Sequence, residues 1–144
     1  MSIDRAAMFG VLRSLRFGGG RWVVAGSGPM LALGLVDSVS DIDIVGDAAA
    51  WKAAVSVSHR GPRAGKLGDR LVELTVNGVS IEVSDGWLGT GADQIIGEAL
   101  EIEGYLFLPL ERVLDSKRKL LRQKDLAHIE ILEARLALGP TAES

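Results

Sequence analysis

Hydrophobic positions along the chain recur with two different spacings, and each spacing predicts one kind of element. Apolar residues three and four positions apart indicate helices, and Met8, Val11, Leu12 and Leu15 are the clearest set. Short apolar runs that alternate with polar positions indicate strands. The predicted helices span residues 3–16, 29–36, 47–55 and 91–100. The predicted strands span residues 22–25, 41–46, 71–76, 79–83 and 105–108.

Turn residues separate these elements and suggest how they are connected. Asn77-Gly78 predicts a tight hairpin between two of the strands, because this pair favours a two-residue turn. Pro109 opens a C-terminal helical region, in which two helices would meet around residues 123–124. Helices, strands and one hairpin in this order predict an α/β (α+β) fold, with a small mixed sheet flanked by helices.

Length and composition define the class of protein. A chain of 144 residues with 47% hydrophobic residues predicts one folded domain, residues 1–139, followed by a loose tail at 140–144. The net charge of −3 gives no electrostatic footprint for general nucleic-acid binding. The lack of cysteine excludes disulfides, thiolate zinc sites and a cysteine nucleophile. We expect a cytoplasmic protein with no membrane partner, because no leader or long apolar run is visible.

Two acidic residues one position apart carry the strongest functional signal. On a strand, Asp41 and Asp43 would share one face while Ile42 and Ile44 enter the core. Two carboxylates on one face suit Mg²⁺, which prefers hard oxygen ligands. The alternative is the exposed face of an edge strand, where acidic residues are common.

A glycine-serine turn precedes this acidic pair, with fourteen positions from Ser27 to Asp41. Gly26 and Ser27 would lie between a strand and a helix, where backbone amides and a hydroxyl can hold a phosphate. Alternatively, Ser27 only caps the helix. The turn is not a Walker motif, because no Gly-Lys-Ser/Thr follows it.

A third acid follows in the predicted hairpin. Glu82 would face opposite to its apolar neighbours, Ile81 and Val83, and could serve as a metal ligand or a general base. Glu73 and Asp85 are nearby alternatives.

Several cations allow more than one interpretation from the sequence. Lys117 falls within an apolar helical stripe, so it must extend to solvent, form an ion pair or face a cleft. Lys124-Asp125 is interpreted as a structural element within a helix. A basic loop could close over phosphates or an RNA acceptor, or could simply be solvated. Its cations are Arg60, Arg63, Lys66 and Arg70.

Taken together, these motifs resemble the nucleotidyltransferase superfamily of the DNA polymerase β type. The resemblance rests on Gly26-Ser27, Asp41-Ile42-Asp43-Ile44 and Ile81-Glu82-Val83, and it covers about residues 5–136. The run from 110 to 129 is similar to the end of small bacterial members, including the nucleotidyltransferase toxins of toxin–antitoxin systems. Two positions depart from the pattern: many relatives have a basic residue near Asp37, and the third acid is often Asp.

The resemblance implies a nucleotidyltransferase-type sheet and a set of site residues. Asp41, Asp43 and Glu82 would hold two Mg²⁺ ions, and Gly26, Ser27 and Lys117 would hold the phosphates of an NTP. The protein would transfer NMP to a hydroxyl of RNA, a protein or a small molecule. The alternative is a catalytically inactive binding protein on this fold, acting as a toxin–antitoxin or regulatory partner. A third possibility is an interaction domain whose acids are only solvated.

Overall fold

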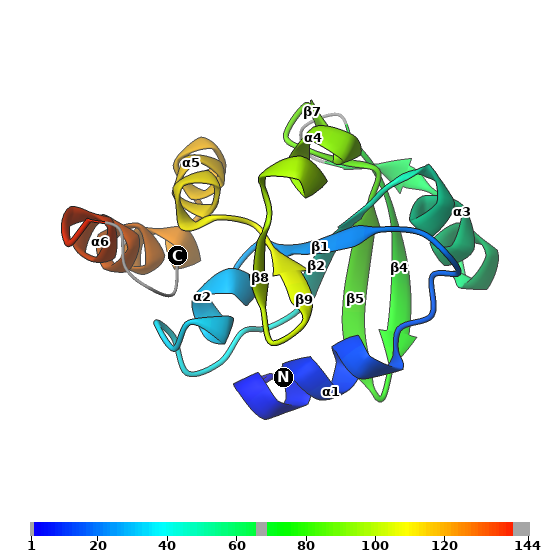
Figure 1. The fold of residues 1–144 in the computed structure, drawn as a ribbon, viewed down its shortest axis with the longest axis horizontal. Coiled ribbons are helices and arrows are strands. Elements are labelled where there is room, and N and C mark those ends of the chain that lie inside the picture. The colour runs from blue at the N-terminus through cyan, green and yellow to red at the C-terminus, as the bar shows by residue number, and fades with distance from the viewer. Residues whose placement is uncertain (1, 66–68, 140–144) are drawn as a thin grey trace.

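The computed structural model describes residues 2–65 and 69–139. Its main feature is a seven-stranded sheet with the strand order β3-β4-β5-β2-β1-β9-β8 (Figure 1). The pairs β2–β5 and β1–β9 are parallel and the other pairs are antiparallel, so the sheet is mixed, as predicted. Its strands are β1 (Trp22–Ala25), β2 (Ile42–Gly46), β3 (Arg63–Ala64), β4 (Arg70–Val76), β5 (Val79–Ser84), β8 (Leu100–Ile102) and β9 (Tyr105–Phe107). A separate two-stranded ribbon consists of β6 (Gly86–Trp87) and β7 (Thr90–Gly91).

Helices cover both faces of this sheet. They are α1 (Arg5–Ser14), α2 (Gly28–Ala32), α3 (Ala48–Val57), α4 (Ala92–Glu98), α5 (Leu110–Leu120) and α6 (Gln123–Ala137). Apolar residues of α1 and α3 form one core with the sheet face that carries Ile42 and Ile44. Apolar residues of α4, α5 and α6 form a second core with the opposite face. Figure 1 shows α5 and α6 together at one side of the molecule, with α3 at the other.

Local sequence signals explain several element boundaries. The Asp47 side chain accepts a hydrogen bond from the backbone amide of Ala50 and caps α3, as predicted. Asn77 and Gly78 have φ angles of 52° and 76°, which is the left-handed geometry expected of the tight hairpin between β4 and β5.

Other boundaries differ from the prediction. Helix α2 ends at Ala32 rather than near residue 36, because the chain turns at Gly34 with φ 76°. The helix predicted over 91–100 ends at Glu98, and residues 100–102 instead form β8 against β9. The C-terminal region does form two helices, which meet at Leu121.

The predicted tail at 140–144 and Lys66 of the basic loop lie outside the described residues. Within the described part of the chain, no helix combines the length and apolar character needed to cross a membrane.

Candidate functional site

The register of the sheet brings two of the predicted acids together. Asp43 on β2 pairs with Glu82 on the parallel strand β5, and with Ala25 on β1 at its other side. Ile42 and Ile44 are fully buried in the core of the opposite face, as the alternation predicted. Glu82 therefore lies beside Asp43, and β2 is an interior strand of the sheet, so the edge-strand alternative is wrong.

Gly26 directly contacts this acidic row. It follows β1 with φ 61°, and a Cβ at this position would overlap the Oδ2 atom of Asp43. Only glycine combines this backbone conformation with the close approach of the carboxylate. The strand end, the turn and Asp43 therefore form one unit.

Ser27 and Lys117 are brought together from positions ninety residues apart. Ser27 holds the N-cap position of α2 but makes no side-chain capping bond. Its Oγ instead accepts a hydrogen bond of 2.8 Å from Nζ of Lys117 on α5. Lys117 is only 2% exposed, so it does not extend to solvent along the helix edge.

Asp125 on α6 organises the cations of the site. This fully buried carboxylate forms an ion pair of 3.2 Å with Lys117. It also accepts bonds of 2.8 Å from Nε and 2.9 Å from the backbone amide of Arg122. The network joins the turn after β1 to both C-terminal helices.

The charges in this network shift several pKa values. Burial alone would raise the pKa of Asp125, but its bonds with Arg122 and Lys117 lower the pKa to about 2. Burial lowers the pKa of Lys117, and Asp125 opposes that shift. The carboxylate therefore keeps its negative charge beside two cations over the physiological pH range.

These groups surround one cavity of about 520 Å³. Its lining includes the predicted site residues Gly26, Ser27, Asp41, Asp43, Glu82 and Lys117. Arg63, Arg122, Lys124 and His128 also line it. Asp43 and Glu82 lie on β2 and β5 in the middle of the sheet, and Asp41 directly precedes β2. Lys117 lies on α5, Lys124 lies on α6, and Arg122 lies between these two helices.

The acids repel one another in this setting. Burial, followed by the charges of Asp41 and Glu82, raises the pKa of Asp43 to about 7. Burial and the charge of Asp41 also raise the pKa of Glu82. A bound cation would relieve this repulsion.

The donor set fits Mg²⁺ when the ion shares a phosphate ligand. Among the described residues, no three acidic or histidine side chains converge into a complete cation site. Mg²⁺ in phosphate-transfer sites usually takes only one or two carboxylates, with phosphates and waters as its other ligands. Asp41 and Asp43 would supply those carboxylates, and Glu82 lies next to them.

The structure also shows where the two alternatives to Glu82 lie. Asp85 binds Arg70 with a 2.9 Å ion pair, and Glu73 lies on β4, one strand further from Asp43 than Glu82.

Sequence reasoning missed Arg122 and treated Asp125 as a structural element within its helix. The available signal was the three-residue spacing of Arg122 and Asp125, which lets the Asp125 carboxylate accept a hydrogen bond from the Arg122 amide at the start of α6.

Comparison with known proteins identifies the fold. No family model matches the chain, and no curated protein matches it. A crystal structure of a Thermotoga maritima protein described as a "putative nucleotidyltransferase" superposes with a TM-score of 0.65. The alignment covers 89% of this chain and 93% of that protein, at 20% sequence identity. The chain has a nucleotidyltransferase-type fold.

In this nucleotidyltransferase-type fold, the glycine-serine turn follows β1, the acidic pair lies at the start of β2, and these two strands are neighbours in the sheet. An identity of 20% establishes the fold alone, so the chemistry of the site is argued from its own side chains.

Proposed function

We propose that the protein is a Mg²⁺-dependent nucleotidyltransferase that moves NMP from an NTP to a hydroxyl acceptor. One observation carries the proposal: the Gly26 turn, the Asp43 carboxylate and the Lys117–Ser27 pair meet at a single cavity. A group of acids beside a group of cations suits a substrate with a metal-bridged triphosphate.

Each group has a distinct role in this proposal. The amides of the Gly26 turn, together with Lys117 and Arg122, bind the phosphates, and Asp41 and Asp43 hold Mg²⁺. The bound metal would neutralise charge that develops on the phosphate oxygens and activate the attacking group. Asp125 orients the two cations and stays away from the reacting atoms.

The proposed reaction is a single in-line displacement. The acceptor oxygen forms a bond to the α-phosphorus, the bond between that phosphorus and the bridging oxygen to the β-phosphate breaks, and pyrophosphate leaves. The hydroxyl proton passes to Glu82, because burial and the charge of Asp41 raise the pKa of this carboxyl.

A labelling reaction tests the proposal. Purified protein is incubated with Mg²⁺, cell extract and each α-³²P-labelled NTP in turn. The expected result is label on one acceptor with the wild type, and none with Asp41→Asn or Asp43→Asn. Asp93→Asn on α4 is the matched control, because this acid does not line the cavity. Transfer by a folded Asp43→Asn variant would refute the assignment.

A second candidate is a binding protein on the same fold that takes up NTP without transferring it. The observation that favours it is the lack of a complete three-ligand cation site among the described residues. Calorimetry separates the two candidates: NTP binding that needs Lys117, without label transfer to any acceptor, would identify the binding protein.

A further inference from the structure

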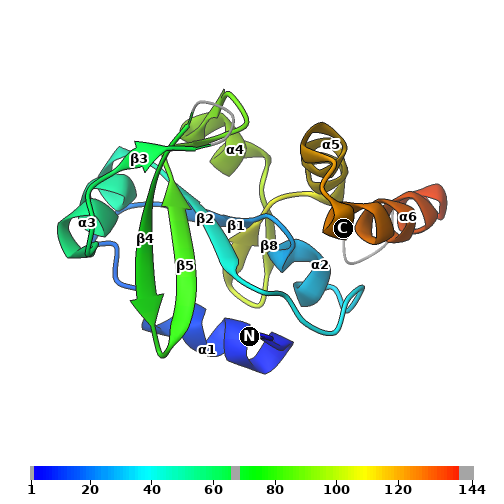
Figure 2. The ribbon, with the colours of Figure 1, turned by 180° about the vertical axis from the view of Figure 1, so that it is seen from behind.

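The cavity has a positively charged group on the side opposite to Lys117. Arg63 lies on β3, the outermost strand of the sheet, which pairs with β4. Arg63, Ala64 and Gly65 line the cavity and form what we term the β3 wall. Figure 2 shows β3 at one edge of the sheet, while α5 and α6 lie at the other side of the molecule.

The acids lie between the β3 wall and the cations of the C-terminal helices. The order β3-β4-β5-β2-β1 places Glu82 and Asp43 on the two strands in the middle. Neighbouring strands are about 4.8 Å apart, so β3 and β1 are separated by roughly 19 Å. Arg63 and Lys117 therefore approach the acids from opposite directions.

Arg63 has donors available for a ligand. Its ion pair in the described structure is with Glu73, at 3.6 Å, and both side chains are about half exposed. A pair of this kind contributes little, because solvent screens it and the atoms are too far apart for a hydrogen bond. A guanidinium presents five donors in a planar fork that matches a phosphate.

The geometry of in-line displacement determines from which side of the cavity the acceptor must approach. The attacking hydroxyl must approach the α-phosphorus from the side opposite to the leaving pyrophosphate. Under the proposed function, the pyrophosphate lies toward Lys117 and Arg122. The acceptor therefore enters from the side of β3.

We propose that the β3 wall is the acceptor site, and that the acceptor carries a phosphate close to its reacting hydroxyl. The inference rests on the proposed function, because that function sets the direction of the leaving group. Arg63 binds the acceptor phosphate, and Glu73 competes for the same guanidinium. Both the end of an RNA strand and a small phosphorylated alcohol have this chemistry.

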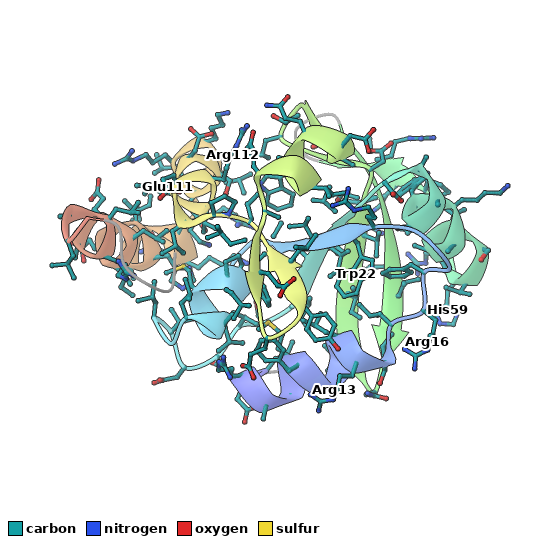
Figure 3. The ribbon with its side chains drawn as sticks, in the orientation of Figure 1. Arg13, Arg16, Trp22, His59, Glu111 and Arg112 are labelled. Carbon is teal, nitrogen blue, oxygen red and sulfur yellow. The ribbon has the colours of Figure 1, made fainter. Side chains whose placement is uncertain are left out.

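The test measures binding of defined probes in the presence of Mg²⁺ and a non-hydrolysable NTP analogue. The probes are an unstructured fluorescein-labelled oligoribonucleotide with a free 3′-hydroxyl, glycerol 3-phosphate, and glycerol as the unphosphorylated counterpart. The variants are Arg63→Gln and Glu73→Gln. Arg13→Gln on α1 is the matched control, because Arg13 is an exposed arginine that does not line the cavity (Figure 3).

Opposite effects are expected from the two wall variants. Arg63→Gln should weaken binding of the phosphorylated probe by about tenfold or more, because a charge-assisted bond is lost. Glu73→Gln should strengthen it by a few-fold, since the competing carboxylate is removed. Arg13→Gln should leave it unchanged. Binding of the oligoribonucleotide but not of glycerol 3-phosphate identifies a nucleic-acid acceptor. Binding of glycerol 3-phosphate identifies a small acceptor. Either result supports the proposal.

Three results would overturn the inference. Wild-type protein could bind neither phosphorylated probe, or bind glycerol as well as glycerol 3-phosphate. Alternatively, Arg63→Gln could weaken binding of the NTP analogue itself, which would assign Arg63 to the nucleotide. Failure of the proposed function looks different, because the wild type would then bind no NTP analogue or transfer no label.

Discussion

Replacing Asp125 by asparagine tests whether one buried carboxylate holds the cations of the site. Asparagine has nearly the same shape and still accepts a hydrogen bond, but it carries no charge. The variant leaves Lys117, which is 2% exposed, beside Arg122 without the negative group that both contact. Two buried or half-buried cations would then repel each other.

The magnitude follows from the pKa of Asp125. Folding lowers it from 3.8 to about 2, and two pKa units correspond to about 2–3 kcal/mol of interaction with the charged form. Removing one partner of a buried ion pair costs about 3–5 kcal/mol. We expect Asp125→Asn to lower the free energy of unfolding by about 2–4 kcal/mol at pH 7.

The pH dependence supplies an independent check. Because the folded pKa lies below the unfolded value, the contribution of Asp125 is present above about pH 4 and is lost as pH falls toward 2. Urea unfolding from pH 7 to pH 2 should therefore show a steeper loss of stability for the wild type than for Asp125→Asn.

An exposed acid on the neighbouring helix provides the control. Asp115 is 52% exposed and pairs with Lys119, so Asp115→Asn should change stability by only about 0.5 kcal/mol. The reasoning is refuted if the free energy of unfolding of Asp125→Asn lies within about 1 kcal/mol of the wild-type value at pH 7. It is also refuted if the free energies of unfolding of the two proteins change in parallel with pH.

Two further substitutions probe backbone conformation. Gly26→Ala should abolish nucleotide transfer in the labelling assay, because the added Cβ would displace the Asp43 carboxylate. Gly18→Ala is the control and should retain transfer, because Gly18 also has a φ of 61° but has open space around it. Leu121→Gly should raise the free energy of urea unfolding by about 0.5–1 kcal/mol, because an exposed leucine with φ 46° occupies the left-handed region; an unchanged or lower value would contradict this.

Tight turns show what local sequence can and cannot predict. The hairpin at Asn77-Gly78 was predicted because asparagine favours positive φ. Leu88-Gly89 and Glu103-Gly104 adopt the same pair of positive φ angles and close the β6–β7 and β8–β9 hairpins. Both hairpins were missed, since leucine and glutamate rarely take this conformation and pairing of the flanking strands must impose it.

The candidate site likewise combines residues that local sequence patterns predict with contacts that only tertiary packing creates. The alternation of Asp41-Ile42-Asp43-Ile44 and the turn at Gly26 are local patterns, so these residues could be proposed from the sequence. The joint role of Asp125 with Arg122 and Lys117 depends on how α5 and α6 dock against the turn after β1. No spacing along the chain specifies that docking, because it arises from tertiary contacts between the C-terminal helices and the sheet.

The position of Asp125 in the chain also sets an order of events during synthesis. All strands of the main sheet have left the ribosome once residue 107 has emerged, and the acidic row on β2 and β5 is then complete. Lys117 follows later, and its counter-charge only after a further eight residues. A nascent chain that ends between these points would contain the acids, the turn and Lys117, but not Asp125, the carboxylate that pairs with this lysine in the folded domain. Under the proposed function, nucleotide binding would therefore require residues through Asp125, which come after the last strand of the sheet.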